Sequence, residues 1–456
     1  MSPERNILMS CVIFGAGKIA RGFIGHLLYL SDIPFAFVEK ADVLVDLLNE
    51  RGQYPVNILG APEKNCTVKG IPALKFSDEE EIVDRIAHAD AVFNAVGGKN
   101  LDQIVPFYTK GIERRAALAE AVSEKLRGGT TEEALTQEER RLLQPLNFIT
   151  CENWKKPADI LRSGIDDAIS EEAKPWYQEN VGITEAVILR SGIDATAQQR
   201  EADPLWVNVQ DYWQLHVDAS RLKGVTEEDI AVCNGRLAEE PSLSIGAIAD
   251  PQGPDLLRIK GLHLLDSFDG FLERKFYTYN AANGTVSFMG ALLGYEILSD
   301  AARDPFILEN LDGVYRETSQ ALCKKYGFEW DDQWAFTRTS LKKLQDVTIV
   351  DTIERNARDP IRKLGPDDRL VGSARMVYGY GILPEHLCTS IACAIFYKPP
   401  VPDVTDDSAD ELARLRREEG IDYIIEHVCR LDPAGEIADT IRAKISMLKE
   451  RGYIKE

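Results

Sequence analysis

Residues 11–22 read CVIFGAGKIARG, which is a short apolar run followed by a glycine loop and the start of a helical pattern. The apolar side chains Ile19, Phe23 and Leu27 continue that pattern at helical spacing. A strand that runs through such a loop into a helix is typical of a dinucleotide-binding unit. We interpret Gly15 as the tight turn, and Gly17 as the point where the backbone can approach a pyrophosphate at the positive helix end.

The second predicted strand, IPFAFVE, ends at Glu39, which is 22 residues beyond Gly17. An acid there can accept hydrogen bonds from ribose hydroxyls and repels a 2′-phosphate, so the sequence predicts NAD in preference to NADP, a preference that Lys40 weakens slightly. Lys18 and Arg21 could add positive charge near the phosphates. A tight turn without a cofactor would show part of the same pattern. The predicted cofactor-binding residues are Gly15, Ala16, Gly17, Lys18, Ile19, Arg21, Glu39, Val96 and Gly97.

Further buried strands are predicted within 88–100, 145–153 and 181–192, and they alternate with helical segments. This order indicates an α/β fold with a doubly wound parallel sheet. Segment 205–218 predicts a strand and then a helix. Because nearly everything from Asp266 onward has a helical pattern, we predict two domains: a Rossmann-type dinucleotide-binding domain over 1–265 and a mainly α-helical substrate and catalytic domain over 266–456.

The composition is acidic, with 74 Asp and Glu against 53 Lys and Arg and a net charge of -21. Such a charge disfavours nucleic acid and anionic membrane surfaces as partners. The start does not resemble a signal peptide, and no apolar run approaches the roughly 18 residues of a membrane span. Eight scattered cysteines without a CxxC pair predict reduced thiols and no metal site. We therefore expect a cytoplasmic protein with a small-molecule partner, monomeric or weakly homo-oligomeric.

The segment LERKFYTYNAANG, residues 272–284, places Lys275 and two asparagines within an aromatic, apolar stretch. On an α-helix with a step of about 100° per residue, Asn283 lies about 80° and Asn280 about 140° from Lys275, so all three share one side. A buried lysine with a lowered pKa can act as general base for an alcohol, and asparagine amides can donate to the developing oxyanion. Spacing alone leaves open a lysine that reaches solvent beside two surface asparagines.

Several motifs together resemble the polyol-specific long-chain dehydrogenases and reductases, and most closely the mannitol-1-phosphate 5-dehydrogenase branch. They are FGAGKIARGFIG, CENW, VNVQDYWQLHVD with RLKG, FLERKFYTYNAANG, and DTIERNARDPIRKLGPDDRL with YGYGILPEHL. The resemblance implies NAD-dependent, metal-independent interconversion of a sugar alcohol, such as mannitol 1-phosphate, and a ketose, such as fructose 6-phosphate. It implies that Lys275 is the base and that Asn280 and Asn153 donate to the oxyanion.

Two positions depart from that family. Asn283 stands where the family has a histidine that helps to hold the substrate. We expect Asn283 to orient the substrate in its place, since an amide can donate or accept a hydrogen bond, although it cannot take up a proton near neutral pH. Leu189 stands where an aspartate that contacts polyol hydroxyls is usual. An unphosphorylated polyol or ketose, a hexuronate, or a catalytically lapsed nucleotide-binding protein therefore remain alternatives.

A basic segment over 355–370 could hold a substrate phosphate. Arginine side chains match phosphate oxygens in pairs, and the resemblance to the sugar-phosphate branch favours Arg362, Lys363 and Arg369 as a substrate-binding clamp. The acids interleaved with them would instead suit a salt-bridged helix end.

Overall fold

The computed structural model describes residues 9–239, 255–400 and 405–454. The chain divides into two compact units, Met1–Phe268 and Asp269–Glu456, and each is described by itself. Within the described residues, no helix has the length and hydropathy needed to cross a bilayer.

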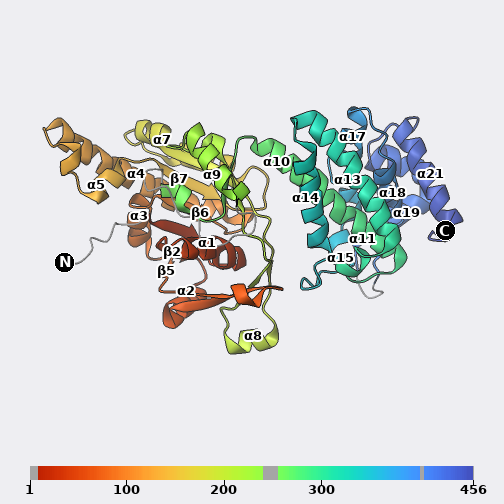
Figure 1. Cartoon of the computed structure of the whole chain (residues 1–456), viewed down its shortest axis with the longest axis horizontal. Coiled ribbons are helices and arrows are strands. Elements are labelled where there is room, and N and C mark those ends of the chain that lie inside the picture. The colour runs from red at the N-terminus through yellow and green to blue at the C-terminus, as the bar shows by residue number, and fades with distance from the viewer. Residues whose placement is uncertain (1–8, 240–254, 401–404, 455–456) are drawn as a thin grey trace. The chain divides into compact units, whose positions relative to one another are not determined.

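The first unit is built on a sheet of eight strands (Figure 1). Its order is β12-β11-β8-β7-β6-β1-β2-β5, and every neighbouring pair is parallel except β11 with β8. The predicted doubly wound α/β fold is confirmed, with this one antiparallel exception. The strands are β1 (Cys11–Phe14), β2 (Phe35–Glu39), β5 (Ala73–Lys75), β6 (Ala91–Asn94), β7 (Leu146–Thr150), β8 (Val181–Val187), β11 (Leu215–Asp218) and β12 (Leu262–Leu265).

Both faces of this sheet are covered, which explains why its central strands are continuously apolar. Successive residues point to opposite faces, so Ile13 belongs to one buried cluster and Val12 and Phe14 to another. Helices α1 (Gly25–Leu30) and α2 (Asp42–Arg51) contribute to the first cluster. The second cluster holds side chains of α3 (Glu79–Ala87), α4 (Leu101–Arg127), α6 (Pro157–Ala168) and α7 (Lys174–Asn180).

A second, four-stranded sheet in the same unit was not predicted. Its order is β4-β3-β10-β9, with bounds Cys66–Lys69, Gln53–Ile58, Val207–Val209 and Gly192–Ile193. The predicted helix in the second half of 205–218 is wrong, because Leu215–Asp218 form the buried strand β11 between β8 and β12. The other helices are α5 (Gln137–Leu142), α8 (Ala197–Ala202) and α9 (Glu227–Glu239).

The second unit is helical, as predicted, and is arranged around α11 (Ala281–Leu293). Most of α11 is buried, and α13, α15 and α18 pack against it. Gly294 ends α11 in the left-handed conformation, with φ +82°. The other helices are α10 (Phe268–Lys275), α12 (Leu298–Ala301), α13 (Pro305–Tyr326), α14 (Trp330–Leu344), α15 (Ile353–Ala357), α16 (Pro360–Lys363), α17 (Val371–Gly379), α18 (Glu385–Ile395), α19 (Asp407–Glu418), α20 (Ile421–Tyr423) and α21 (Glu436–Glu450).

Candidate functional site

The glycine loop between β1 and α1 is closed on one side and open on the other. Gly15 has φ +90°, and a Cβ atom on it would lie 2.5 Å from the carbonyl oxygen of Ala95, so only glycine fits there. A Cβ on Gly17 would meet no atom within 4 Å. The backbone at Gly17 therefore faces free space, as a phosphate-binding loop at a helix start requires.

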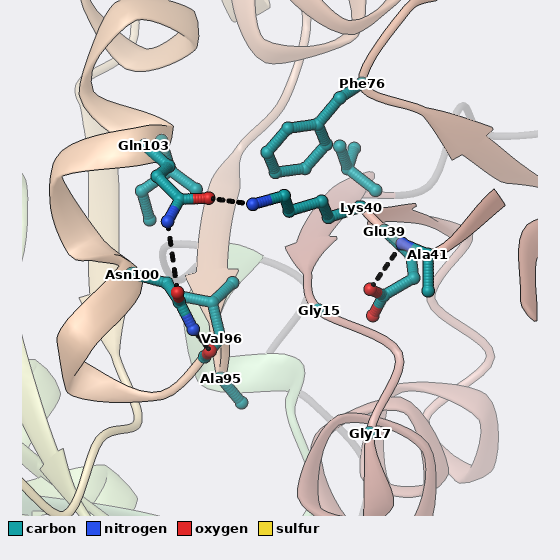
Figure 2. A pocket seen from close by; sticks show the side chains of 12 residues that line it. Gly15, Gly17, Glu39, Lys40, Ala41, Phe76, Ala95, Val96, Asn100 and Gln103 are labelled. Atoms are coloured by element: carbon teal, nitrogen blue, oxygen red, sulfur yellow. Dashed lines mark hydrogen bonds between the residues drawn. The ribbon is translucent and has the colours of Figure 1, made fainter.

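A cavity of about 520 Å³ adjoins this loop at the carboxyl ends of β1, β2 and β6 (Figure 2). This end of a parallel sheet is where open α/β folds bind their ligands. Four predicted residues line the cavity: Gly15, Gly17, Glu39 and Val96. The other lining residues are Val38, Lys40, Ala41, Phe76, Ala95, Asn100, Gln103 and Ile104.

The Glu39 carboxylate is fixed at the edge of this cavity by two backbone donors. The N–H of Ala16, in the glycine loop, donates to its Oε2 at 2.7 Å, and the N–H of Ala41 donates to its Oε1 at 3.0 Å. A carboxylate has about four acceptor positions, so each oxygen keeps capacity for a ligand hydroxyl. Ala16 thus contributes to the site through its backbone.

A chain of hydrogen bonds that the sequence did not indicate runs along the cavity wall (Figure 2). Lys40 Nζ donates to Gln103 Oε1 at 2.9 Å, Gln103 Nε2 donates to Asn100 Oδ1 at 3.1 Å, and Asn100 Nδ2 donates to the carbonyl oxygen of Val96 at 2.7 Å. Gln103 and Asn100 lie at the start of α4, so only the sheet topology brings them to the end of β2. No local pattern could have identified them.

Arg21 does not lie where we predicted. Its side chain is buried, and its Nε donates to the carbonyl oxygen of Ala16 at 2.7 Å while another guanidinium nitrogen donates to the carbonyl oxygen of Leu205. Arg21 therefore supports the glycine loop from inside the fold instead of adding charge on its open side. Lys18 lies outside and pairs with Asp194, and Ile19 packs against the core beneath the loop.

The backbone at Val96 and Gly97 is held by Glu152, a residue that the sequence analysis did not single out. The N–H of Val96 donates to Glu152 Oε1 at 2.7 Å, and the N–H of Gly97 donates to Oε2 at 3.0 Å. Burial raises the pKa of Glu152. Asn153 follows it directly and is exposed. The sequence signal that could have identified Glu152 is its place directly before Asn153, just after the end of β7.

In the second unit, Lys275 ends α10 and is half-buried. Burial lowers the pKa of this lysine to about 8. Lys343 on α14, which the sequence did not indicate, has its pKa lowered to about 8 by burial and by the charge of Lys275. The second unit therefore holds a lysine that can lose its proton near neutral pH, at the position predicted for the base.

The segment after Lys275 is not the continuous α-helix that we assumed for its geometry. Phe276–Asn280 form a π turn, closed by the N–H of Ala281, which donates to the carbonyl oxygen of Phe276 five residues earlier. A π turn spans about one residue more than an α turn, so residues five apart lie about one turn apart. Asn280 therefore follows Lys275 on the same side of the helix, and the angle of 140° was wrong.

Buried Gln333, on α14, connects the middle of this turn to the residue before Lys275. Its Oε1 accepts a hydrogen bond from Arg274 Nε at 2.7 Å. Its Nε2 donates to Thr278 Oγ1 at 3.2 Å and to Ser319 Oγ at 3.1 Å. Gln333 and Thr278 are both 0% exposed, so these bonds are shielded from water. A side chain more than fifty residues away thus supports the turn between Lys275 and Asn280.

Asn283, one turn further along, contacts the basic segment. Its Nδ2 donates to Asn356 Oδ1 at 2.9 Å, and the main-chain oxygen of Asn356 accepts from Lys363 Nζ at 2.6 Å. Lys363 is buried, and burial with the nearby charges of Arg369 and Arg362 lowers its pKa to about 8. Asn283 and Lys363 thus both form hydrogen bonds with Asn356, the first with its side chain and the second with its main chain.

The two arginines of the predicted clamp are paired with acids. Arg362 Nε lies 2.7 Å from Asp359, and another of its nitrogens lies 3.0 Å from Asp368. Arg369 Nε lies 3.0 Å from the same Asp368, and the Arg369 side chain packs against Gly284 of α11. This arrangement matches the salt-bridged helix end that the sequence left open.

Leu189, which stands where the family usually has an aspartate, is buried in the first unit.

Two family comparisons cover most of the chain. Residues 9–228 match the mannitol dehydrogenase Rossmann domain, and residues 267–425 match the mannitol dehydrogenase C-terminal domain. The chain belongs to the mannitol dehydrogenase family. Both domains of that family are therefore present, in the expected order.

Solved structures agree with this family fold at low sequence identity. D-sorbitol dehydrogenase in substrate-free form superimposes with a TM-score of 0.65 at 14% identity, over 98% of this chain and 97% of that one. Mannitol 2-dehydrogenase of Pseudomonas fluorescens, solved with NAD and D-mannitol, gives a TM-score of 0.60 at 13% identity, over 98% and 93% of the two chains. At such identities the likeness concerns the fold alone.

Proposed function

We propose that this member of the mannitol dehydrogenase family is an NAD-dependent, metal-independent polyol dehydrogenase with Lys275 as general base. The observation that carries the proposal is the half-buried Lys275, with its pKa lowered to about 8, followed one π turn later by Asn280. A neutral lysine can accept the proton of a secondary alcohol, and the Asn280 amide can donate to the oxygen that becomes a carbonyl.

The first unit fits the adenosine and pyrophosphate part of NAD. The open backbone at Gly17 suits the pyrophosphate, and the fixed carboxylate of Glu39 suits the ribose hydroxyls. When bound, NAD would supply the hydride acceptor for alcohol oxidation. We propose that Asn153, exposed at the end of β7, is the second donor to the substrate oxygen.

For the substrate we propose a hexitol phosphate, such as mannitol 1-phosphate, which would be oxidised to fructose 6-phosphate. Buried Lys363, with Arg362 and Arg369 near it, supports an anionic substrate, since a bound phosphate would offset the burial and the neighbouring charges that lower the pKa of this lysine and would favour its charged form. The aspartate pairing of Arg362 and Arg369 favours a second candidate, an unphosphorylated polyol or ketose, or a hexuronate.

The deciding experiment tests whether the protein reduces fructose 6-phosphate, fructose or a hexuronate with NADH. The reaction is monitored through the loss of NADH absorbance. Turnover of the phosphate alone, lost in Lys275→Ala, would support the first substrate. The matched control is Lys342→Ala, since Lys342 is an exposed lysine on α14, and this variant should keep full activity. Turnover of an unphosphorylated sugar alone would favour the second candidate. NADH binding without turnover of any substrate would contradict the proposed activity.

A further inference from the structure

Asn283 takes part in a hydrogen-bond chain whose direction is fixed at its far end. Asn356 Nδ2 donates to the carbonyl oxygen of Thr352 at 2.9 Å, and Asn356 Oδ1 accepts from Asn283 Nδ2 at 2.9 Å. A main-chain carbonyl can only accept a hydrogen bond. Asn356 must therefore direct its NH₂ group toward Thr352 and its oxygen toward Asn283.

The orientation of the Asn283 amide follows from this chain. Because Asn356 presents an oxygen, Asn283 must present its NH₂ group to it, and a flipped amide would place two oxygens together. The Oδ1 of Asn283 is thus never used by Asn356. Asn283 keeps that oxygen as an acceptor and one N–H as a donor. A hydroxyl can satisfy both, whereas a carboxylate, which only accepts, leaves the oxygen without a partner.

Asn283 lies close enough to the proposed catalytic residues for the orientation of its amide to affect substrate binding. It lies one turn after Asn280 on the helix that begins beyond Lys275, and it is half-buried. We propose that Asn356 is a specificity-determining positioning residue, which holds the Asn283 amide so that its oxygen accepts a hydrogen bond from a substrate hydroxyl. This inference rests on the proposed function, and it selects a polyol or ketose hydroxyl over a carboxylate at this position.

The side chain of Asn356 can be changed without removing the contact to Lys363. Lys363 Nζ donates to the main-chain oxygen of Asn356, which every substitution retains. Asn356 is half-buried near the end of the short helix α15, so Asn356→Ala is compatible with the helix. A change in substrate affinity can then be assigned to the side-chain amide.

The test is a double-mutant cycle on the substrate that the wild-type enzyme turns over, with Asn356→Ala, Asn283→Ala and the double variant. Since a hydrogen bond to the substrate is lost, Asn356→Ala should raise KM for that substrate by about tenfold. KM for NAD and the midpoint of the pH profile should not move. In the Asn283→Ala background, Asn356→Ala should change KM by less than about twofold, because the two residues act through one contact.

Asn356→Asp is the conservative variant. Its carboxylate can only accept, so Asn283 must keep its NH₂ group directed toward it. Because the second carboxylate oxygen faces the Thr352 carbonyl, which also only accepts, part of the KM increase rather than all of it should be recovered. Additive effects of Asn356→Ala and Asn283→Ala, an unchanged KM in Asn356→Ala, or an Asn356→Asp variant as impaired as Asn356→Ala would overturn the inference. A wild-type enzyme silent on every substrate would overturn the proposed function and this inference together, whereas an active wild type with additive variants would overturn the inference alone.

Discussion

Lys275 sets the expected pH dependence of the reaction. Burial lowers its pKa to about 8, so below that pH the lysine is mostly charged and cannot accept a proton. The kcat/KM for alcohol oxidation should therefore rise about tenfold per pH unit below about 8 and level off above it. Ketone reduction needs the protonated lysine and should fall above the same pH. Rate profiles in both directions test this, and profiles without a transition between pH 7 and pH 9 would contradict Lys275 as the base.

At the residue scale, the sequence predicted those groups whose role follows from their own segment. Glu39 was predicted because an acid at the end of the second strand has a local signal, and the structure places it in the wall of the cavity beside the glycine loop. Arg21 was misplaced because its local signal, a cation in a glycine loop, is the same whether the side chain points outward or inward. Its contact with Leu205 joins residues 184 positions apart. Asn356 had no signal, because its relation to Asn283 exists only when α11 and α15 are packed together.

The glycine loop with its helix is an element in which two glycines have separable roles. A Cβ on Gly22 would lie 2.5 Å from Val209 Cγ1 and 2.6 Å from Val207 Cγ1, both on β10. Gly22→Ala should therefore lower stability by about 1–3 kcal/mol through overpacking, measured by denaturant unfolding.

Gly17→Ala is the matched control for packing, because its Cβ meets no atom within 4 Å. It should leave stability unchanged and weaken NADH binding by at least about tenfold in a fluorescence titration. The reverse pattern would contradict both assignments.

The π turn after Lys275 is the element that Gln333 supports. Replacing the buried Gln333 by leucine leaves Arg274 Nε and the Thr278 hydroxyl without this partner, at a cost of about 1–3 kcal/mol per group. Gln333→Leu should lower the unfolding free energy accordingly. It should also lower kcat, because the spacing of Lys275 and Asn280 depends on this turn, while NADH affinity stays constant. Gln333→Glu, which still accepts from Arg274, should be less impaired, and equal losses in both variants would contradict the bridging role.

The π turn also shows where sequence periodicity stops being informative. The apolar pattern of 266–297 predicts a helix, and a helix is present on both sides of the turn. One extra residue within the turn leaves that pattern almost intact but changes the direction of every following side chain relative to Lys275. The prediction of a helix in the second half of segment 205–218 was wrong for a related reason. Its apolar run is short, and only pairing with β8 and β12 determines that its second half is a strand.

At the scale of the whole molecule, each unit has its own hydrophobic core. One buried cluster contains only residues from 281 onward, and the two large clusters of the first unit contain only residues up to 264. The cavity that suits the cofactor is lined only by residues between Gly15 and Ile104. The order of motifs along the chain could therefore predict an N-terminal Rossmann-type unit and a helical C-terminal unit, because each motif lies within the part of the chain that forms one core.

This separation predicts that residues 1–268, produced alone, fold cooperatively and bind NADH. A domain with its own core and its own ligand cavity needs no second domain for either property. The affinity of this fragment for NADH should lie within about tenfold of that of the full chain, because the cavity lining is complete. The fragment should show no turnover, since Lys275 and Asn280 lie beyond its end. Gly17→Ala in the fragment is the binding control and should weaken NADH as in the full chain. A fragment that unfolds without a cooperative transition, or that folds but does not bind NADH, would show that the second unit completes the core or the cofactor site of the first.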